Sequence, residues 1–259
     1  MFSRLFLRAF NSVVNLVVIL ALMLSGSYAV YALWDNNQVL ESASDVQADM
    51  IKLKPDVELD ADEEPDNSES FAELLKINED VCSWLTMDNT RIDFPVLQGD
   101  TNLSYISTDV YGNFALAGSI YLDSNNDPEF NDSYSLLYGH HMADGRMFGD
   151  LDLYKDESFF KENTTGLLIL PRKAFNLKVI ACLVVKSNDR WFFEPMHVQD
   201  DIEGLLNYTE ENALHLHRDM LRIARQTEDL QLLALSTCSS EFSDARTIVL
   251  TLMEPVNAG

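Results

Sequence analysis

The sequence predicts a mostly β domain that follows an N-terminal membrane anchor. Three features support this: an uncharged apolar run over residues 9–34, an acidic stretch from Pro55 to Glu69, and many short apolar or alternating runs after Ser70. Many short strands with few helices indicate a barrel or a sandwich that carries additional helices. The chain of 259 residues has room for one large domain or two small ones, and its 47% of hydrophobic residues are enough for a packed core.

The N-terminal run is long enough to cross a bilayer as a helix, which takes about 20 residues. Arg4 and Arg8 precede the run, and Asp35 is the first charged residue after it. The positive-inside rule therefore predicts a cytoplasmic tail over residues 1–8, a membrane anchor over 9–34 and an extracytoplasmic remainder. A signal peptide cleaved at Ser27–Ala29 is the alternative. The apolar run continues past that point, which favours an uncleaved anchor.

Residues 35–69 are expected to form an acidic spacer that is partly helical. The part from Pro55 to Glu69 has eight acidic residues, two prolines and no basic residue. Such a segment cannot bury enough apolar surface to order itself. A calcium site is disfavoured, because the spacing of ligands and glycine in a calcium loop is missing.

The charge and the cysteines exclude two classes of function. With 42 Asp and Glu against 18 Lys and Arg, the net charge is −24, which argues against a nucleic-acid partner. The cysteines are Cys82, Cys182 and Cys238. They form no CxxC pair and have no close ligand spacing, so no metal site is expected.

Seven runs have the composition of strands: TRIDFPVLQ, AGSIYLD, SYSLLYG, GLLILP, NLKVIACLVV, LQLLALST and TIVLTLM. The compact domain is expected to start at Ser70, where SFAELLKINEDVCSWL has an N-cap serine, a glutamate at the capping-box position and helical spacing of apolar residues. Two amphipathic stretches, residues 146–163 and about 200–225, interrupt the strands and are expected to be helical.

Two strand ends carry reactive side chains. Cys238 ends one predicted strand, and His140 follows another directly after Gly139. A histidine can take the proton of a thiol, and an arginine such as Arg246 can stabilise an oxyanion, so acyl transfer is the chemistry of this set. Residue types alone favour the alternative of a structural thiol, a turn histidine and a surface arginine.

The remaining histidines are expected to lie on the surface. His197, His215 and His217 occur in polar or helical contexts, and i,i+2 spacing on a helix does not bring two rings to one face. Adjacent His140 and His141 would point to opposite sides of an extended segment, so only His140 is expected to face the site.

Four segments resemble the class B sortases. LALSTC is similar to the cysteine signature of that family, and an arginine eight positions later matches it. YGHHMADGRMFGDLDLY resembles the segment around the family's catalytic histidine, INEDVCSWLTMDNTRIDFPVLQGD its early block, and GSIYLDSNND one of its strands. The likeness covers about residues 70–253. Two positions depart from the family pattern: Ala234 replaces a usual threonine, and Ser83 a glycine that commonly precedes the tryptophan.

The resemblance implies an eight-stranded sortase β-barrel with N-terminal helices and a helix between late strands. It implies a catalytic domain over residues 70–254 and a tail over 255–259. Cys238 would be the nucleophile, His140 the general acid and base, and Arg246 the group that stabilises oxyanion and substrate. Ser236 and Thr237 would line the substrate groove.

The resemblance also implies the family's activity, which is transpeptidation at a bacterial cell surface without a cofactor or metal. Such an enzyme cleaves a sorting motif near the C-terminus of a secreted protein. It then transfers the acyl group from its cysteine to an amine of a peptidoglycan precursor or of a pilin lysine. Two alternatives stay open: a cysteine hydrolase that uses only water, and a tethered, non-catalytic β-barrel that binds a partner.

Overall fold

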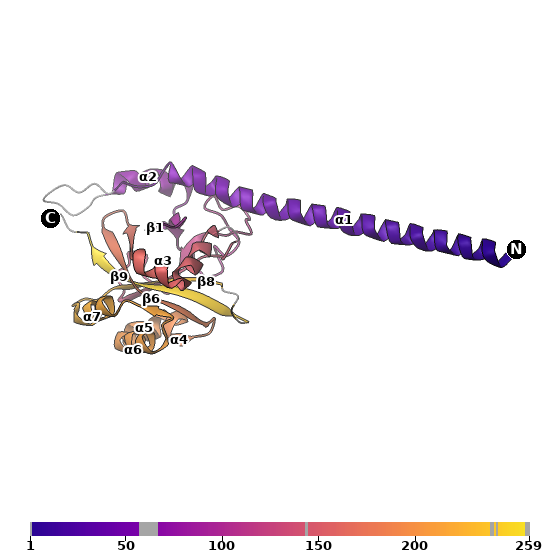
Figure 1. Cartoon of the computed structure of the whole chain (residues 1–259). Coiled ribbons are helices and arrows are strands. Elements are labelled where there is room, and N and C mark those ends of the chain that lie inside the picture. The colour runs from indigo at the N-terminus through magenta and orange to yellow at the C-terminus, as the bar shows by residue number, and fades with distance from the viewer. Residues whose placement is uncertain (1, 57–66, 143–144, 239–240, 242, 257–259) are drawn as a thin grey trace. The chain divides into compact units, whose positions relative to one another are not determined.

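The computed structural model describes residues 2–56, 67–142, 145–238, 241 and 243–256 (Figure 1). The core of the predicted acidic spacer, residues 57–66, and most of the tail, residues 257–259, lie outside the described residues. Contacts divide the chain into two compact units, Met1–Ser42 and Ala43–Gly259. The predicted domain boundaries remain predictions, although Ala43 and Met50 are buried within the second unit.

The first unit is helical. Helix α1 spans Phe2–Ile51, and it is the one helix in the described part of the chain that is long and apolar enough to cross a membrane. Its apolar side chains from Phe10 to Trp34 are exposed. Exposed apolar residues along a helix of this length are the property that a bilayer anchor requires.

The second unit is a closed barrel of eight strands, as predicted. The strand order is β5-β1-β2-β3-β4-β8-β9-β6, and β5 pairs with β6 to close the circle, while the short β7 adds to β6 outside it. The strands are β1 (Val81–Met87), β2 (Asp93–Leu97), β3 (Ile120–Leu122), β4 (Tyr134–Tyr138), β5 (Thr165–Ile169), β6 (Ala174–Lys186), β7 (His215–Leu216), β8 (Leu232–Cys238) and β9 (Ala245–Pro255). The pairs β2–β3 and β4–β8 are parallel and the others antiparallel.

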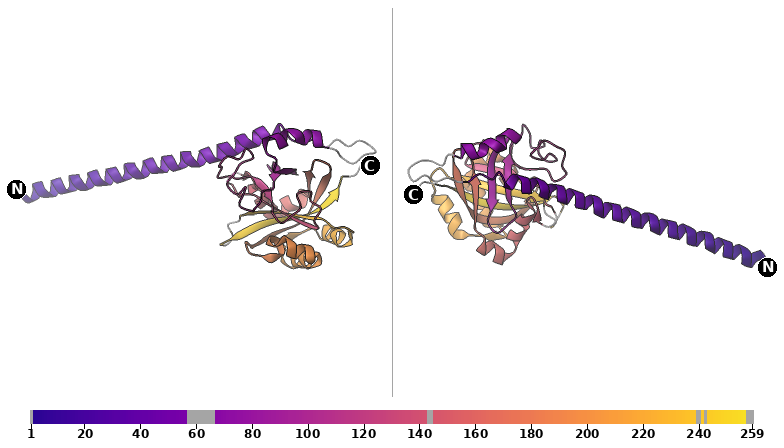
Figure 2. Two further views of the ribbon diagram at one scale, coloured as in Figure 1. Left: turned by 180° about the vertical axis from the view of Figure 1, so that it is seen from behind. Right: turned by 90° about the horizontal axis from the view of Figure 1, so that it is seen from above.

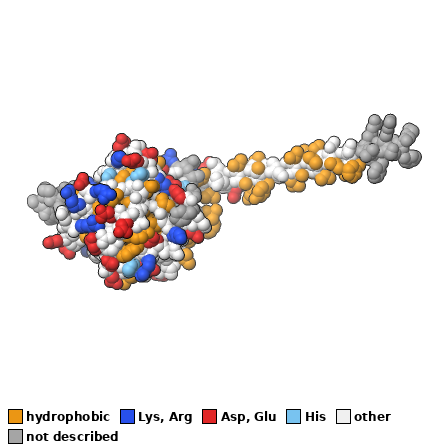
Figure 3. Space-filling model, turned by 60° about the horizontal axis from the view of Figure 1, so that its bottom comes forward, with side chains coloured by type: hydrophobic (Ala, Val, Ile, Leu, Met, Phe, Trp, Pro, Cys, Tyr) orange, Lys and Arg blue, Asp and Glu red, His pale blue; other side chains and the backbone are white. Residues whose placement is uncertain are grey.

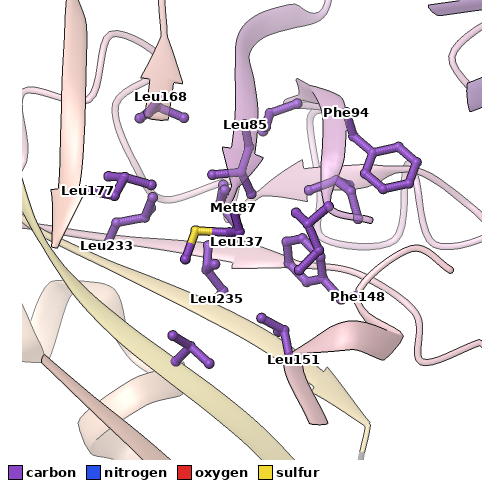
Figure 4. Close-up of a cluster of buried hydrophobic side chains, with 14 of the residues drawn as sticks. Leu85, Met87, Phe94, Leu137, Phe148, Leu151, Leu168, Leu177, Leu233 and Leu235 are labelled. Carbon is purple, nitrogen blue, oxygen red and sulfur yellow. The ribbon is translucent and has the colours of Figure 1, made fainter. Parts of the chain in front are cut away.

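Strand alternation divides the barrel into an inner and an outer apolar layer. On β8, Leu233 and Leu235 belong to the inner cluster, where Figure 4 shows them near Met87 and Leu137. Leu232 and Ala234 belong to the outer cluster. Because successive side chains of a strand point to opposite faces, the face of any later residue on β8 follows from these assignments.

The outer cluster lies under the helices that connect β6 to β8. These are α4 (Arg190–Phe193), α5 (Pro195–Asp200), α6 (Ile202–Asn212) and α7 (Arg218–Gln226). Figures 1 and 2 show all four on one side of the barrel, near β6 and β9. The predicted helix over 200–225 is interrupted, because Leu214 N–H and His217 N–H donate to the carbonyls of Cys182 and Ile180 on β6.

The segment between β4 and β5 is also helical, as predicted. It contains the 3₁₀ helix η2 (Gly149–Lys155) and α3 (Glu157–Glu162). Asp156 is the N-cap of α3 and accepts from the N–H groups of Ser158 and Phe159. Helix η2 packs against β8 and β9, which brings it close to the strand ends that carry the predicted site.

Two predictions for the start of the domain were wrong. Helix α2 spans Ser68–Ile77, so Ser70 is not its N-cap. The actual N-cap, Asn67, is fixed instead by bonds from its N–H to Pro171 O and from its amide to Leu170 O. Strand β1 occupies residues that the helical prediction had included, since a short apolar run such as VCSWL fits either structure.

Replacing Leu177 with alanine should lower the free energy of unfolding by about 2–5 kcal/mol, because a buried leucine leaves a cavity that its neighbours fill only in part. Leu177 is fully buried in the inner cluster. Urea unfolding of the full-length protein in mild detergent, followed by tryptophan fluorescence, measures the loss. Leu214→Ala, at a side chain that is 51% exposed, is the matched control. An equal loss in both variants would contradict this placement of Leu177.

Candidate active site

The ends of three neighbouring strands carry the predicted site residues at one end of the barrel. In the parallel pair β4–β8, Tyr138 is paired with Ser236, and Gly139 N–H donates to Ser236 O over 3.1 Å. His140 and Cys238 each follow these paired residues by two positions, so both lie at the same end of the barrel. In the antiparallel pair β8–β9, Cys238 is paired directly with Arg246.

Cys238 and Arg246 also share one face of the sheet. Alternation along β8 gives Cys238 the outer face of Ala234, and alternation along β9 gives Arg246 the outer face of Ile248. Directly paired residues of antiparallel strands have Cα atoms about 4.5–5.5 Å apart. The guanidinium is half-buried and donates to Ala245 O over 2.9 Å.

The His140 ring contacts the connection between β2 and β3. Its Nε2 lies 2.6 Å from Ile106 O, and because a carbonyl only accepts, Nε2 carries the proton of this bond. The ring is half-buried. Because Nε2 is used in this bond, Nδ1 is the nitrogen that can exchange a proton with another group.

The three thiols have different environments. Cys238 is exposed, Cys82 half-buried and Cys182 buried. Burial raises the pKa of Cys82 and of Cys182 to about 12. Cys238 is the exposed thiol that a substrate can reach, so it is the one suited to covalent chemistry.

An aromatic group that sequence reasoning missed lies beside the cysteine. Tyr138 stacks on Tyr121, with ring centroids 5.2 Å apart, and on Phe193 of α4 at 6.3 Å. Burial, then the charges of Asp123 and Cys238, raise the pKa of Tyr121 to about 12. The phenol of Tyr138 donates to the buried Asp123 over 2.8 Å. Alternation of side chains along SYSLLYG predicts that Tyr138 shares the face of Leu136, and this signal could have found it.

The two expected groove residues lie on different faces. Ser236 shares the face of Cys238, whereas Thr237 lies on the inner face, paired with Thr247. Both side chains are 2% exposed, and neither hydroxyl has a hydrogen-bond partner among the described residues. Ser236 is therefore the better groove candidate of the two.

A cluster of charged and polar groups centred on Asp152 of η2 lies next to the strand ends. Asp152 Oδ2 is 3.1 Å from His141 Nε2, and Asp152 Oδ1 accepts from Thr247 over 2.9 Å. Lys155 Nζ lies 2.7 Å from Asp152 Oδ1 and also donates to Glu241. Burial opposes ionisation of Asp152, but the bonds from Lys155 and Thr247 and the charges of Lys155 and His141 outweigh it and lower its pKa below 3.8.

The three histidines expected on the surface, His197, His215 and His217, are all half-buried. The Nε2 atoms of His215 and His217 donate to the carbonyls of Lys155 and Phe160 over 2.8 and 3.1 Å, which the expectation did not include. His217 also stacks on the Phe160 ring at 4.2 Å. Across the residues that the structure describes, no group of three or more His, Cys, Asp or Glu side chains could hold a metal ion.

A cavity of about 1200 Å³ lies at the other end of the barrel. It is lined in part by Val81, Leu170, Phe175, Gln231 and Met253, which stand at the opposite ends of the strands, and none of the predicted site residues lines it. The strand ends near Cys238, and not this cavity, are therefore the candidate site.

Comparisons with known proteins agree on one family. No protein-family model matches the chain. Sortase B of Staphylococcus aureus is 27% identical over 174 residues, which cover 67% of this chain and 69% of that protein. Sortase B of Listeria monocytogenes is 28% identical over 173 residues, 67% of this chain and 68% of the relative. A Streptococcus pyogenes class B sortase involved in pilus biogenesis has a solved structure with 34% identity and a TM-score of 0.65, covering 71% of this chain and 97% of that one.

Iodoacetamide at pH 8 should label Cys238 alone in the folded protein. A thiol with a pKa of about 12 is ionised to only about one part in 10,000 at pH 8. Peptide mapping by mass spectrometry measures the three rates, and Cys82→Ala is the control that should leave the labelling of Cys238 unchanged. Comparable labelling of Cys82 or Cys182 before unfolding would refute the assigned burial.

Proposed function

The chain belongs to the class B sortases, and on that premise we propose that it is a cysteine transpeptidase anchored in the cell membrane, with its catalytic domain outside the cytoplasm. Its substrates are secreted proteins that carry a C-terminal sorting motif. Its acceptor is an amine of a peptidoglycan precursor or of a pilin lysine. The exposed apolar side chains of α1 support the anchor.

The register of β4, β8 and β9 is the observation that carries the proposal. This register supports the assignment of three roles at one end of the barrel: Cys238 as nucleophile, His140 as general acid and base, and Arg246 as oxyanion donor. A direct pair on neighbouring strands brings Arg246 to the side of Cys238, where the charge on the substrate carbonyl develops. Electrostatic stabilisation at that position is commonly the largest catalytic contribution.

The first half-reaction forms a thioacyl enzyme. The Cys238 thiolate attacks the carbonyl carbon of the scissile peptide bond, and the negative charge moves to the carbonyl oxygen near Arg246. The C–N bond then breaks as His140 donates a proton to the leaving amine. The thioester retains the N-terminal part of the substrate, and the C-terminal fragment departs.

The second half-reaction transfers the acyl group. His140, now neutral, removes a proton from the incoming amine, which attacks the thioester carbonyl. The new amide bond forms as the C–S bond breaks, and the thiolate of Cys238 is regenerated. No step requires a cofactor or a metal.

Three features support parts of this assignment. The bond from His140 Nε2 to Ile106 O leaves Nδ1 for proton exchange. The stacked rings of Tyr121, Tyr138 and Phe193 offer an apolar surface beside the thiol. The pilus role of the Streptococcus pyogenes relative supports a pilin lysine as one of the two acceptor classes.

Cys238→Ala should abolish cleavage of a sorting peptide identified from a peptide library, while the thermal unfolding temperature stays near that of the wild type. His140→Ala should lower kcat by about 10²–10⁴-fold, as expected for loss of a general acid and base, and Arg246→Ala by about 10²–10³-fold. Turnover and trapping of the thioacyl intermediate by mass spectrometry measure these effects. His197→Ala is the matched histidine control.

Retained turnover in Cys238→Ala would defeat the assignment of the nucleophile. A non-catalytic barrel would bind a peptide without cleaving it in any variant. Binding without cleavage by the wild type across the library would therefore favour that alternative.

Adding an amine acceptor should redirect the acyl group from water to the amine. Peptides with a free α-amine and peptides with only a lysine ε-amine test the two acceptor classes, and their Nα-acetylated or Nε-acetylated forms are the controls. Ligated product, measured by mass spectrometry, should rise with acceptor concentration as hydrolysis falls. Hydrolysis that is unchanged by every acceptor would identify a cysteine hydrolase instead.

A further inference from the structure

We propose that Asp152 is a positioning residue that holds together the three chain segments which carry the proposed catalytic groups. This inference rests on the proposed function. We assign Asp152 no contact with the reacting atoms. It acts through the residues next to them in sequence.

Each contact of the cluster leads to a different catalytic segment. Through His141, Asp152 contacts the turn that carries His140. Through Thr247, it contacts the start of β9 directly after Arg246. Through Lys155, which pairs with Glu241, it reaches the connection that follows Cys238.

The carboxylate is well suited to this role because it accepts on both oxygens. Oδ2 faces the His141 ring, and Oδ1 faces the hydroxyl of Thr247 and the ammonium of Lys155. A neutral amide of the same shape would lose the charge and would turn one acceptor into a donor. The three segments would then lose a shared point of attachment.

The supporting groups are held firmly. Thr247 is fully buried, and Lys155 is only 17% exposed, so its pairing is less screened than that of a surface salt bridge. Asp152 itself lies on η2, which packs against β8 and β9. The main chain of the histidine turn is tied down nearby, because Phe148 N–H donates to His140 O.

Asp156 provides a matched control a few residues away. It is also a carboxylate that accepts several hydrogen bonds, but it caps α3 and accepts from Ser158 and Phe159 only within its own helix. Loss of this cap should destabilise the protein without disturbing the strand ends. Asparagine would keep the cap, so the control that removes it is Asp156→Ala, and the pair Asp152→Asn and Asp156→Ala separates positioning from stability.

The test measures kcat and KM for cleavage of the sorting peptide by these variants of the full-length protein. Asp152→Asn should lower kcat by about 10–100-fold, since small misplacements of catalytic groups have effects of this size, while KM changes less than about threefold. Asp156→Ala, which removes the cap of α3, should keep the wild-type kcat despite a lower unfolding temperature. The double variant Asp152→Asn, Thr247→Val should lose less than the product of the two single losses.

A second readout is independent of turnover. The rate at which iodoacetamide labels Cys238 should fall in Asp152→Asn and stay unchanged in Asp156→Ala, because only a correctly placed histidine can take the proton of the thiol. If the wild type cleaves no peptide, the proposed function fails, and this rate still decides the role of Asp152. A wild-type labelling rate in Asp152→Asn, or a kcat that falls equally in both variants, would overturn the inference.

Discussion

The parallel hydrogen-bonded contact between β4 and β8 is the constraint on which the candidate site depends. A parallel pair requires a long crossover, and here the crossover contains η2, α3, β5, β6, β7 and the four helices of the outer layer. Residues far apart in the chain therefore end at the same edge, at Tyr138 and Ser236. The antiparallel return of β9 then brings Arg246 beside Cys238. Closure by β5 and β6 removes the free edges of the sheet.

Sequence reasoning predicted the strands whose apolar runs are isolated by turn residues, and it failed where local signals conflict. VCSWL follows a helical segment with no glycine or proline between them, so the sequence pattern extends the predicted helix over the residues of β1. The start of α2 depends on contacts of Asn67 with the distant turn after β5. The roles proposed for Cys238, His140 and Arg246 came from motif resemblance. No local pattern predicts Asp123 beneath Tyr138 or Asp152 beside Thr247, because those partners meet only after folding.

The acidic residues of this chain include solvated surface groups and aspartates that accept hydrogen bonds within the fold. Figure 3 shows acidic side chains interspersed with basic ones over one face of the second unit. Several aspartates are instead acceptors at junctions between segments. Asp123 is 1% exposed and accepts from Asn102 and Tyr138, and Asp93 accepts from the buried Trp84. Asp123 thus joins the connection after β2 to β4, and Asp93 joins β1 to β2. A net charge of −24 does not reveal these roles.

The distribution of thiols determines how such a domain would respond to oxidants. Cys182 is buried, and the half-buried Cys82 lines the cavity at the opposite end of the barrel from the exposed Cys238. Among the described residues, no second sulfur therefore lies beside Cys238 to convert a sulfenic acid into an internal disulfide. Oxidation at Cys238 would persist until a small thiol or a reductase from outside the molecule reduced it. In an oxidising compartment, the lifetime of the active protein would then depend on its reducing partners.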